Sequence, residues 1–161
     1  MTIIFQEMSQ NSFLGYKENL IRGYAQEKVK AGTWLEEESL QKAIETTERL
    51  LPQGINTPNH HMLDIVLADS NEKIGMSWLH FDNERLQKEA FIYDFFIEKD
   101  NRDKGFGTAA LNALEEYVRA LGAKKLSLHV FGHNERAVHL YQKVNFQITD
   151  LVMSKELEGT C

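Results

Sequence analysis

The chain has 161 residues, a length that suits a single domain with a hydrophobic core of its own. Its content of 42% hydrophobic and 26% charged residues is usual for a globular protein, and the formal net charge of −6 argues against a nucleic-acid-binding surface. The sequence has no run of about 18 apolar residues, and its first residues lack the basic start and apolar stretch of a signal peptide. We therefore expect no membrane association.

The sequence contains one cysteine, Cys161, which is its last residue. A single cysteine excludes a disulfide within the chain and is typical of the reducing cytoplasm, where we expect this protein to be located. Because chain ends are usually mobile, Cys161 is an unpromising catalytic nucleophile.

The first third of the chain predicts one short strand, over residues 2–7, and two helices. Ser9 or Ser12 can cap the first helix, which runs to about residue 30 with apolar side chains at helical spacing. The second helix is predicted over residues 36–51, with three glutamates at its positive end. We expect these two helices to shape a substrate entrance.

Three strands with short turns follow, and they predict an antiparallel meander. They cover residues 62–68, 73–80 and 89–97, and Gly75 within the second indicates a bulge or a close approach of another backbone. Trp34 and Trp78 suit either the core or the wall of a substrate site.

The last third predicts a helix over residues 105–121 and a strand over 125–130, which together with the preceding strand form a parallel crossover. Asn134 can cap another helix that runs to about residue 143. A final strand is predicted over residues 146–155.

The turn between the strand at 89–97 and the helix after it has the features of an anion-binding site. The first amides of a helix have no partner within the helix, and the macrodipole adds positive charge there. Gly105 and Gly107 lack side chains that would keep a phosphate away from these amides, and Arg102 and Lys104 bring positive charge. We predict that a cofactor pyrophosphate is held by Arg102, Asp103, Lys104, Gly105, Phe106, Gly107 and Thr108.

Three other interpretations of the same glycines are possible. Gly105, Gly107 and Ala110 also fit the dinucleotide-binding pattern, but the next strand ends Leu128-His129-Val130-Phe131 without the carboxylate which that fold needs. No Gly-Lys-Ser/Thr follows, which excludes a Walker loop. A tight turn that binds nothing is the remaining alternative.

A second motif, N-x-x-A-x-x-L-Y-x-K-x-x-F, follows the strand at 125–130 and consists of Asn134, Ala137, Leu140, Tyr141, Lys143 and Phe146. Together with the R-x-x-G-x-G motif about thirty residues earlier, it resembles the GNAT superfamily of N-acetyltransferases. The segments EAFIYDF, SLHVFGHN and VMSKEL also resemble a bacterial branch of that family, the YycN-like proteins. Asn145 stands at a position where the family usually has glycine, but asparagine also tolerates the left-handed backbone of a helix end.

The resemblance implies an α/β fold with a mixed, mostly antiparallel central sheet and helices on both faces. It implies one N-acetyltransferase domain over residues 1–161, whose cofactor-binding core spans about residues 89–146. In the family, acetyl-CoA lies between the fourth and fifth strands, with its pantetheine along backbone that corresponds to Phe96 and Ile97. The asparagine that matches Asn134 often contacts the cofactor, and the tyrosine that matches Tyr141 lies near the sulfur.

Acetyl transfer to an amine requires a group that takes a proton and one that supplies a proton. A tyrosine, with a pKa of about 10, is protonated at neutral pH and can protonate the departing thiolate, which makes Tyr141 the predicted general acid. His129 is the predicted base, because the family members that acetylate a ribosomal protein have a glutamate at that position. Asp94 is the second candidate, and ordered water a third.

We therefore predict an acetyl-CoA-dependent N-acetyltransferase that acts on a primary amine, either a small molecule or a peptide, by direct attack in a ternary complex. The alternative is a non-catalytic acyl-CoA-binding sensor. His60, His61 and His80 show no ligand spacing on one element, so we expect no metal. The sequence carries no code for the acceptor, and homodimers are common in the family.

Overall fold

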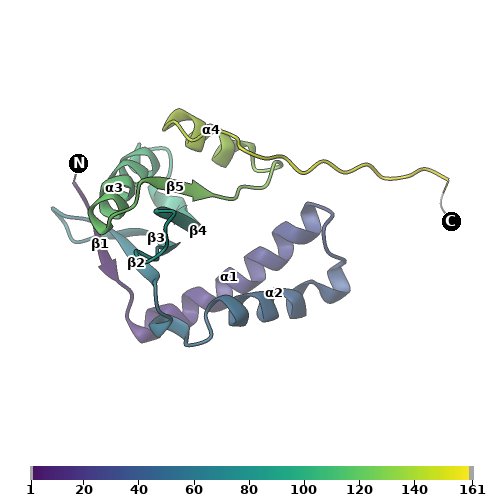
Figure 1. The fold of residues 1–161 in the computed structure, drawn as a ribbon, viewed down its shortest axis with the longest axis horizontal. Helices are drawn as coiled ribbons and strands as arrows, with labels where there is room; N and C mark the ends of the chain where they lie inside the picture. The colour runs from purple at the N-terminus through teal and green to yellow at the C-terminus, as the bar shows by residue number, and fades with distance from the viewer. Residues whose placement is uncertain (1, 160–161) are drawn as a thin grey trace.

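A computed structural model describes residues 2–159 as a five-stranded sheet between two layers of helices (Figure 1). The strands follow one another in the sheet in chain order, and all neighbours are antiparallel except the last pair, which is parallel. The strands are β1 (Ile3–Glu7), β2 (His60–Leu67), β3 (Lys73–His80), β4 (Glu89–Ile97) and β5 (Lys125–Leu128). The predicted mixed, mostly antiparallel sheet is confirmed.

The helices cover both faces of this sheet. The pair α1 and α2 lies on one side and α3 on the other (Figure 1). The helices are α1 (Gln10–Lys30), α2 (Glu36–Leu50), α3 (Phe106–Leu121) and α4 (Glu135–Lys143), with the short 3₁₀ turns η1 (Gly54–Asn56) and η2 (Lys99–Asn101).

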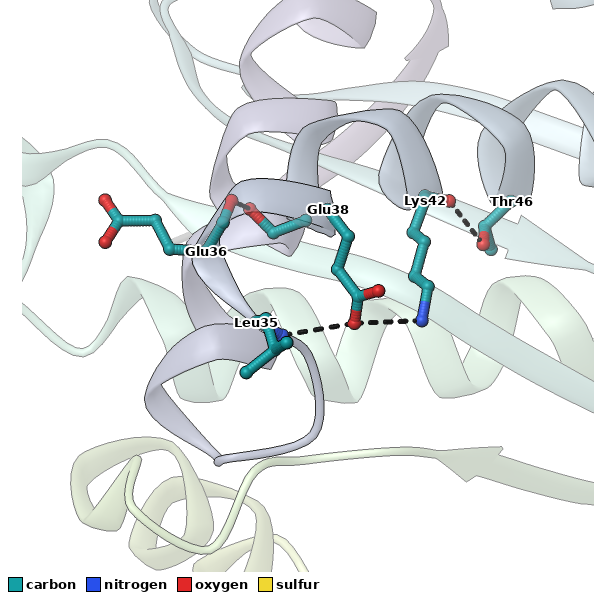
Figure 2. Close-up of polar contacts among 6 residues, drawn as sticks. Leu35, Glu36, Glu38, Lys42 and Thr46 are labelled. Atoms are coloured by element: carbon teal, nitrogen blue, oxygen red, sulfur yellow. Dashed lines mark hydrogen bonds and ion pairs between the residues drawn. The ribbon is translucent and has the colours of Figure 1, made fainter. Parts of the chain in front are cut away.

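Local side-chain contacts explain where the helices begin. The Ser9 hydroxyl accepts from the Ser12 amide at 3.1 Å, as predicted for the start of α1. At α2, the position before the helix is Leu35, which has no capping oxygen, and the Glu38 carboxylate accepts from the Leu35 amide at 3.2 Å instead. The Lys42 ammonium lies 3.0 Å from the same Glu38 carboxylate, and Figure 2 shows both contacts of Glu38.

The sheet separates two apolar layers. On the side of α1 and α2, Phe13, Met62 and Trp78 are buried together. On the side of α3, Leu79 and Leu114 are buried in a larger cluster that draws in side chains of α4. Burial of these side chains provides the main driving force for assembling the layers.

Gly75 confirms the predicted close approach between strands. A Cβ atom at Gly75 would lie 2.2 Å from the carbonyl oxygen of Phe96 on β4. The register between β2 and β3 also shifts beside it, between Ile65 and Val66, so the predicted bulge is present as well.

Some predicted bounds need correction, and one predicted strand is wrong. β5 ends at Leu128 rather than residue 130, because β4 and β5 part there. The strand predicted over residues 146–155 does not form, since no neighbouring strand pairs with this segment within the described part of the chain. Pairing partners, which local sequence does not reveal, decide where a strand exists.

Among residues 2–159, no helix is long and apolar enough to cross a membrane. Cys161, the unpromising nucleophile of the sequence analysis, lies outside the described residues.

Candidate active site

A gap in strand pairing marks the centre of the candidate site. β4 and β5 pair in register only from Glu89 beside Lys125 to Ile92 beside Leu128. β4 then continues to Ile97, where β3 is its strand neighbour among the described residues. Beyond Ile92, the edge of β4 that faces away from β3 therefore has no neighbouring strand among the described residues. The sequence predicts that the cofactor passes Phe96 and Ile97 in this part of β4.

A bulge in β4 sits where this gap begins. Trp78 of β3 is opposite Asp94, but the next residue, Leu79, is opposite Ile92, so Tyr93 is an extra residue in β4. A bulge bends its strand and changes the direction of the side chains beside it. It places Asp94 on the α1 side of the sheet, where its carboxylate meets α1.

Asp94 is a buried carboxylate with a close partner. The hydroxyl of Tyr16 on α1 donates a hydrogen bond to Asp94 Oδ2 at 2.5 Å. Burial raises the pKa of Asp94 to about 6, although the bonds from Tyr16 and the Phe95 backbone act in the opposite direction. The pKa of Tyr16 is raised well above its usual value, first by burial and then by the Asp94 charge. In this pair the proton stays on the Tyr16 phenol, and the Asp94 carboxyl group has a pKa of about 6.

Tyr141 lies on α4 near this pair. Its ring packs edge-on against Phe146 at 5.8 Å between centroids, and the side chain contacts the core layer on the α3 side. Burial, followed by the charge of Asp94, raises the pKa of Tyr141 to about 12. A negative charge that acts on Tyr141 shows that α4 brings this phenol into the electrostatic range of Asp94.

His129 follows the last residue of β5 and has different neighbours. Its ring packs edge-on against Phe131, with 4.9 Å between centroids. Burial and then the positive charge of Lys28 on α1 lower the pKa of His129. The ring is therefore neutral at pH 7, and the charge that acts on it comes from Lys28 rather than from Asp94.

The turn after β4 has the predicted glycine-opened geometry. Gly105 precedes α3 in the left-handed conformation, with φ of 81°, and no side chain caps the helix. Left-handed backbone favours glycine, which explains Gly105. The first amides of α3 have no partner in the helix ladder, so the turn offers the donors that a diphosphate requires.

The charged residues of this turn divide into two kinds. Arg102 Nε donates to the carbonyl oxygen of Ile97 at 2.8 Å, so this guanidinium bridges the turn back to β4. The carboxylate of Asp103 is 2.7 Å from Arg136 of α4. Asp103 also has a left-handed backbone, with φ of 62°. Asp103 thus shapes the turn and links it to α4, while Lys104 is exposed and available to an anion.

Gly107 also has a packing role. A Cβ atom there would lie 3.3 Å from Leu140 Cδ2 of α4 and 3.9 Å from Ile97 Cγ1. The missing side chain allows α4 to pack on the start of α3, and the predicted role of Gly107 beside a phosphate stays a prediction.

Asn134 caps α4, as predicted, because its side-chain oxygen accepts from the Ala137 amide at 3.3 Å. Just before it, His133 bonds to Glu27 of α1, which connects the loop after β5 to the opposite helix layer. Asn145 ends α4 with a left-handed φ of 75°, as expected for a substitute for glycine.

An aromatic surface lies beside the bulge. Tyr93 stacks on Trp78 with 4.6 Å between centroids, and Phe91 meets Tyr93 edge-on at 4.8 Å. The Trp78 indole donates to His60 Nδ1 at 2.9 Å, and the rings of His60 and His80 are 4.7 Å apart. Burial, followed by the neighbouring histidines, lowers the pKa of His60 to about 4, so this ring is neutral at pH 7.

The contacts of these histidines bear on their ability to bind a metal. No group of three or more His, Cys, Asp or Glu residues that could hold a metal occurs within residues 2–159. His60 already uses Nδ1 to accept from Trp78.

Two contributors to the site were missed by the sequence analysis. Tyr16 looks like any buried aromatic residue on an amphipathic helix, and its distance of 78 positions from Asp94 leaves no local signal. Arg136 pairs with Asp103 across 33 positions, and its place in the first turn of α4 carries no local indication of this contact.

Comparisons with known proteins identify the family of this chain. Residues 27–146 match the Acetyltransferase (GNAT) family. The chain is 45% identical to the uncharacterized N-acetyltransferase YycN of Bacillus subtilis (strain 168) over 159 residues, which are 98% of this chain and 100% of that protein. It is 38% identical to the uncharacterized N-acetyltransferase YdgE of the same strain over 157 residues, which are 98% and 99% of the two chains.

Solved structures share the fold. The crystal structure of the putative acetyltransferase YycN from Bacillus subtilis matches with a TM-score of 0.92 and 44% identity, covering 97% of this chain and 99% of that one. The spermidine N-acetyltransferase of Vibrio cholerae shares the fold alone, with a TM-score of 0.64 and 20% identity over 98% and 88% of the two chains. The match of residues 27–146 and the near full-length similarity to YycN together show that this chain belongs to the GNAT family of acetyltransferases.

Proposed function

We propose that this protein transfers the acetyl group of acetyl-CoA to a primary amine by direct attack in a ternary complex. The observation that carries the proposal is the Tyr16–Asp94 pair with Tyr141 beside it, at the point where β4 and β5 part. Amide formation from a thioester needs a proton acceptor and a proton donor. This open strand edge offers both, with strongly different pKa values.

The residues present fit the chemistry of acetyl-CoA. The diphosphate would meet the first amides of α3, Gly105 in its left-handed conformation, and the positive side chain of Lys104. The pantetheine would run along the backbone of Phe96 and Ile97, and Asn134 at the start of α4 would flank it. Bound acetyl-CoA supplies the activated acetyl group.

Asp94 is the base that we favour. An amine must lose a proton before it attacks a carbonyl carbon, and a carboxylate with a pKa of about 6 is ionised at pH 7 yet more basic than an ordinary aspartate. Tyr16 fixes the orientation of this carboxylate through its 2.5 Å hydrogen bond. His129 is the second candidate base, because its lowered pKa leaves it neutral and able to accept a proton.

Tyr141 is the proposed acid. With a pKa raised to about 12, its phenol keeps its proton throughout the physiological range. It can donate a hydrogen bond to the thiolate as the C–S bond breaks and then supply the proton that forms the thiol, whose pKa is about 8.5. The amine nitrogen gains the acyl carbon, the thiol leaves, and the proton lost by the amine balances the proton gained by sulfur.

The aromatic surface beside Asp94 is the proposed wall of the acceptor site. Tyr93 is the exposed ring of this surface, stacked on the buried Trp78 and met edge-on by Phe91. Its ring face attracts cations, and the ionised Asp94 attracts them further. The spermidine N-acetyltransferase of Vibrio cholerae, which shares the fold, was solved in complex with CoA and spermine. Polyamines are therefore sensible first members of an amine panel that also includes peptide N-termini and aminoglycosides.

The test follows release of free thiol when the protein is mixed with acetyl-CoA and each amine. We expect release with at least one amine, and Tyr141→Phe should lower kcat by roughly 10²-fold while CoA affinity stays nearly unchanged. Tyr117→Phe is the matched control, since Tyr117 packs on Phe5 and His61 instead of near Asp94.

Two results would contradict the proposal. Tight CoA binding without thiol release from any amine would favour the non-catalytic sensor. Equal turnover by Tyr141→Phe and the unsubstituted protein would remove Tyr141 from the acid role.

A further inference from the structure

One face of α1 leads away from the proposed reaction site. Tyr16, whose hydroxyl bonds to Asp94, is followed on this face by Gly23 after about two helical turns and by Glu27 after about three. At about 3.6 residues per turn, both residues lie within about 20° of Tyr16 around the helix axis, and Glu27 is about 16 Å farther along it. The three residues therefore form a line that begins at the Asp94 carboxylate.

The space beside this line is open at Gly23. A Cβ atom at Gly23 would have no packing neighbour within 4 Å, although the residue itself is half-buried. Leu20, on the same side of α1, packs against the buried cluster that includes Trp78 and contributes apolar surface. The face thus offers room for a flexible apolar chain between Asp94 and Glu27.

A carboxylate marks the far end of the line. Glu27 Oε2 lies 2.5 Å from His133 Nε2, so the last turns of α1 meet the loop after β5 (Figure 1), and the Glu27 side chain is 39% exposed. In the described part of the chain no lysine or arginine pairs with Glu27, and the adjacent Lys28 is held over the rings of Tyr24 and Trp34. Because a histidine can be neutral, the Glu27 carboxylate can bind a cation from solution without losing a permanent ion pair.

Two carboxylates with an apolar stretch between them fit a molecule with two cationic ends. Asp94 is ionised at pH 7 and fixed by Tyr16, and Glu27 provides the second negative charge. An ammonium group at either carboxylate makes a charge-assisted hydrogen bond, which is about twice as strong as a neutral one. A methylene chain between the two ammonium groups would lie over Leu20 and Gly23. A monoamine can satisfy only one end.

We propose that Glu27 determines specificity for long diamines, by binding one ammonium group while the amine at the other end is acetylated beside Asp94. This inference rests on the proposed function and names the class of its acceptor. The reacting nitrogen loses its proton and gains the acetyl carbon, and the thiol leaves with a proton. The distal ammonium keeps its proton and forms no covalent bond, so Glu27 acts through substrate binding and not on the reacting atoms.

The first experiment compares decamethylenediamine with decylamine, a monoamine with the same carbon chain. In assays of thiol release, kcat/KM should be about tenfold higher for the diamine, the effect of one hydrogen bond to a charged group. Glu27→Gln keeps a hydrogen-bonding side chain beside His133 but removes the charge. It should abolish the preference through KM and leave decylamine unchanged. Glu18→Gln is the matched control, because Glu18 pairs with Arg22 on the opposite face of α1 and should keep the preference.

The second experiment fills the space beside Gly23. Gly23→Leu should lower kcat/KM by about tenfold for decamethylenediamine and for decylamine, because both chains must pass this position. Putrescine is a diamine too short to reach Gly23 from Asp94, so its kcat/KM should be the same with both proteins. Circular dichroism checks that each variant is folded. An unchanged kcat/KM for the two long amines would overturn the proposed path along α1.

The remaining outcomes separate this inference from the proposed function. Equal kcat/KM for the diamine and the monoamine, or a diamine preference that survives Glu27→Gln, would overturn the role of Glu27 and leave the acetyltransferase activity standing. Thiol release from no amine would contradict the proposed function. Calorimetry of decamethylenediamine with the CoA-bound protein then still tests the site. Binding about tenfold weaker in Glu27→Gln supports an ammonium site at Glu27, and equal binding overturns it.

Discussion

Asp94 combines two properties that oppose each other. Its burial makes ionisation costly, which raises its pKa to about 6, while the proposed reaction needs the ionised form. The rise from 3.8 to about 6 corresponds to about 3 kcal/mol of folding free energy at pH 7. Tyr16 reduces this cost through its hydrogen bond but does not remove it.

This cost predicts a pH dependence of stability. A carboxyl group with a raised pKa binds its proton more tightly when folded, so its contribution is most favourable below pH 4 and declines as the pH rises to about 6. Asp94→Asn should therefore gain stability relative to the unsubstituted protein between pH 4 and pH 7, by about 1–3 kcal/mol. Urea unfolding at several pH values measures the difference, with the exposed Asp69→Asn as control. A difference that does not vary with pH would contradict the raised pKa.

Asp94 should also determine the pH below which kcat falls, the acid limb of the pH–rate profile. If Asp94 takes the proton, kcat falls below about pH 6, and Asp94→Asn removes both most of the activity and that limb. His129→Gln tests the other candidate base with the same readout. An acid limb that survives in Asp94→Asn and disappears in His129→Gln would transfer the role to His129.

At the scale of elements, the approach of β3 to β4 aligns the site. The carbonyl oxygen of Phe96 lies so near Gly75 that a Cβ atom at this position would be 2.2 Å from it. Because this neighbour is a backbone atom, the clash could be relieved only if β4 moved. β4 carries both the bulge and Asp94, so its position controls the site.

Gly75→Ala should therefore lower stability by about 1–3 kcal/mol in urea unfolding. Gly23→Ala is the matched control, because Gly23 is inside α1 with no atom within 4 Å of the added methyl group. This control should raise stability by about 0.5–1 kcal/mol, as alanine favours a helix. Equal effects of the two substitutions would refute the close-packing argument.

The turn before α3 makes a prediction about phosphate. Lys104 is exposed beside the first amides of the helix, and removal of its charge in Lys104→Gln should weaken CoA binding by about threefold to fivefold. Calorimetry with CoA and with pantetheine, which lacks the diphosphate, separates the two parts of the ligand. Binding of pantetheine should not change, and Lys99→Gln on η2 should leave both unchanged. A similar loss for both ligands would count against a diphosphate at this turn.

At the scale of the whole molecule, three contacts connect the segments that form the site. Asp103 links the turn to α4, His133 links the loop after β5 to α1, and Tyr16 links α1 to β4. Each joins segments far apart in sequence, so the two helix layers meet around the gap between β4 and β5.

The family and most of the helices and strands could be predicted from the amino-acid sequence alone. Ser9, Asn134 and the left-handed Gly105 and Asn145 act through contacts within a few residues, so their roles can be read locally. Motifs at fixed spacing carried the GNAT resemblance, which the family match confirmed.

How residues far apart in the chain meet could be learned from the three-dimensional fold but not from the sequence. The bulge at Tyr93 turns Asp94 toward Tyr16, Gly107 accommodates Leu140, and the predicted last strand has no neighbour to pair with. Each of these depends on the register between strands or on packing between layers, and contacts across many tens of residues leave no periodicity in the sequence.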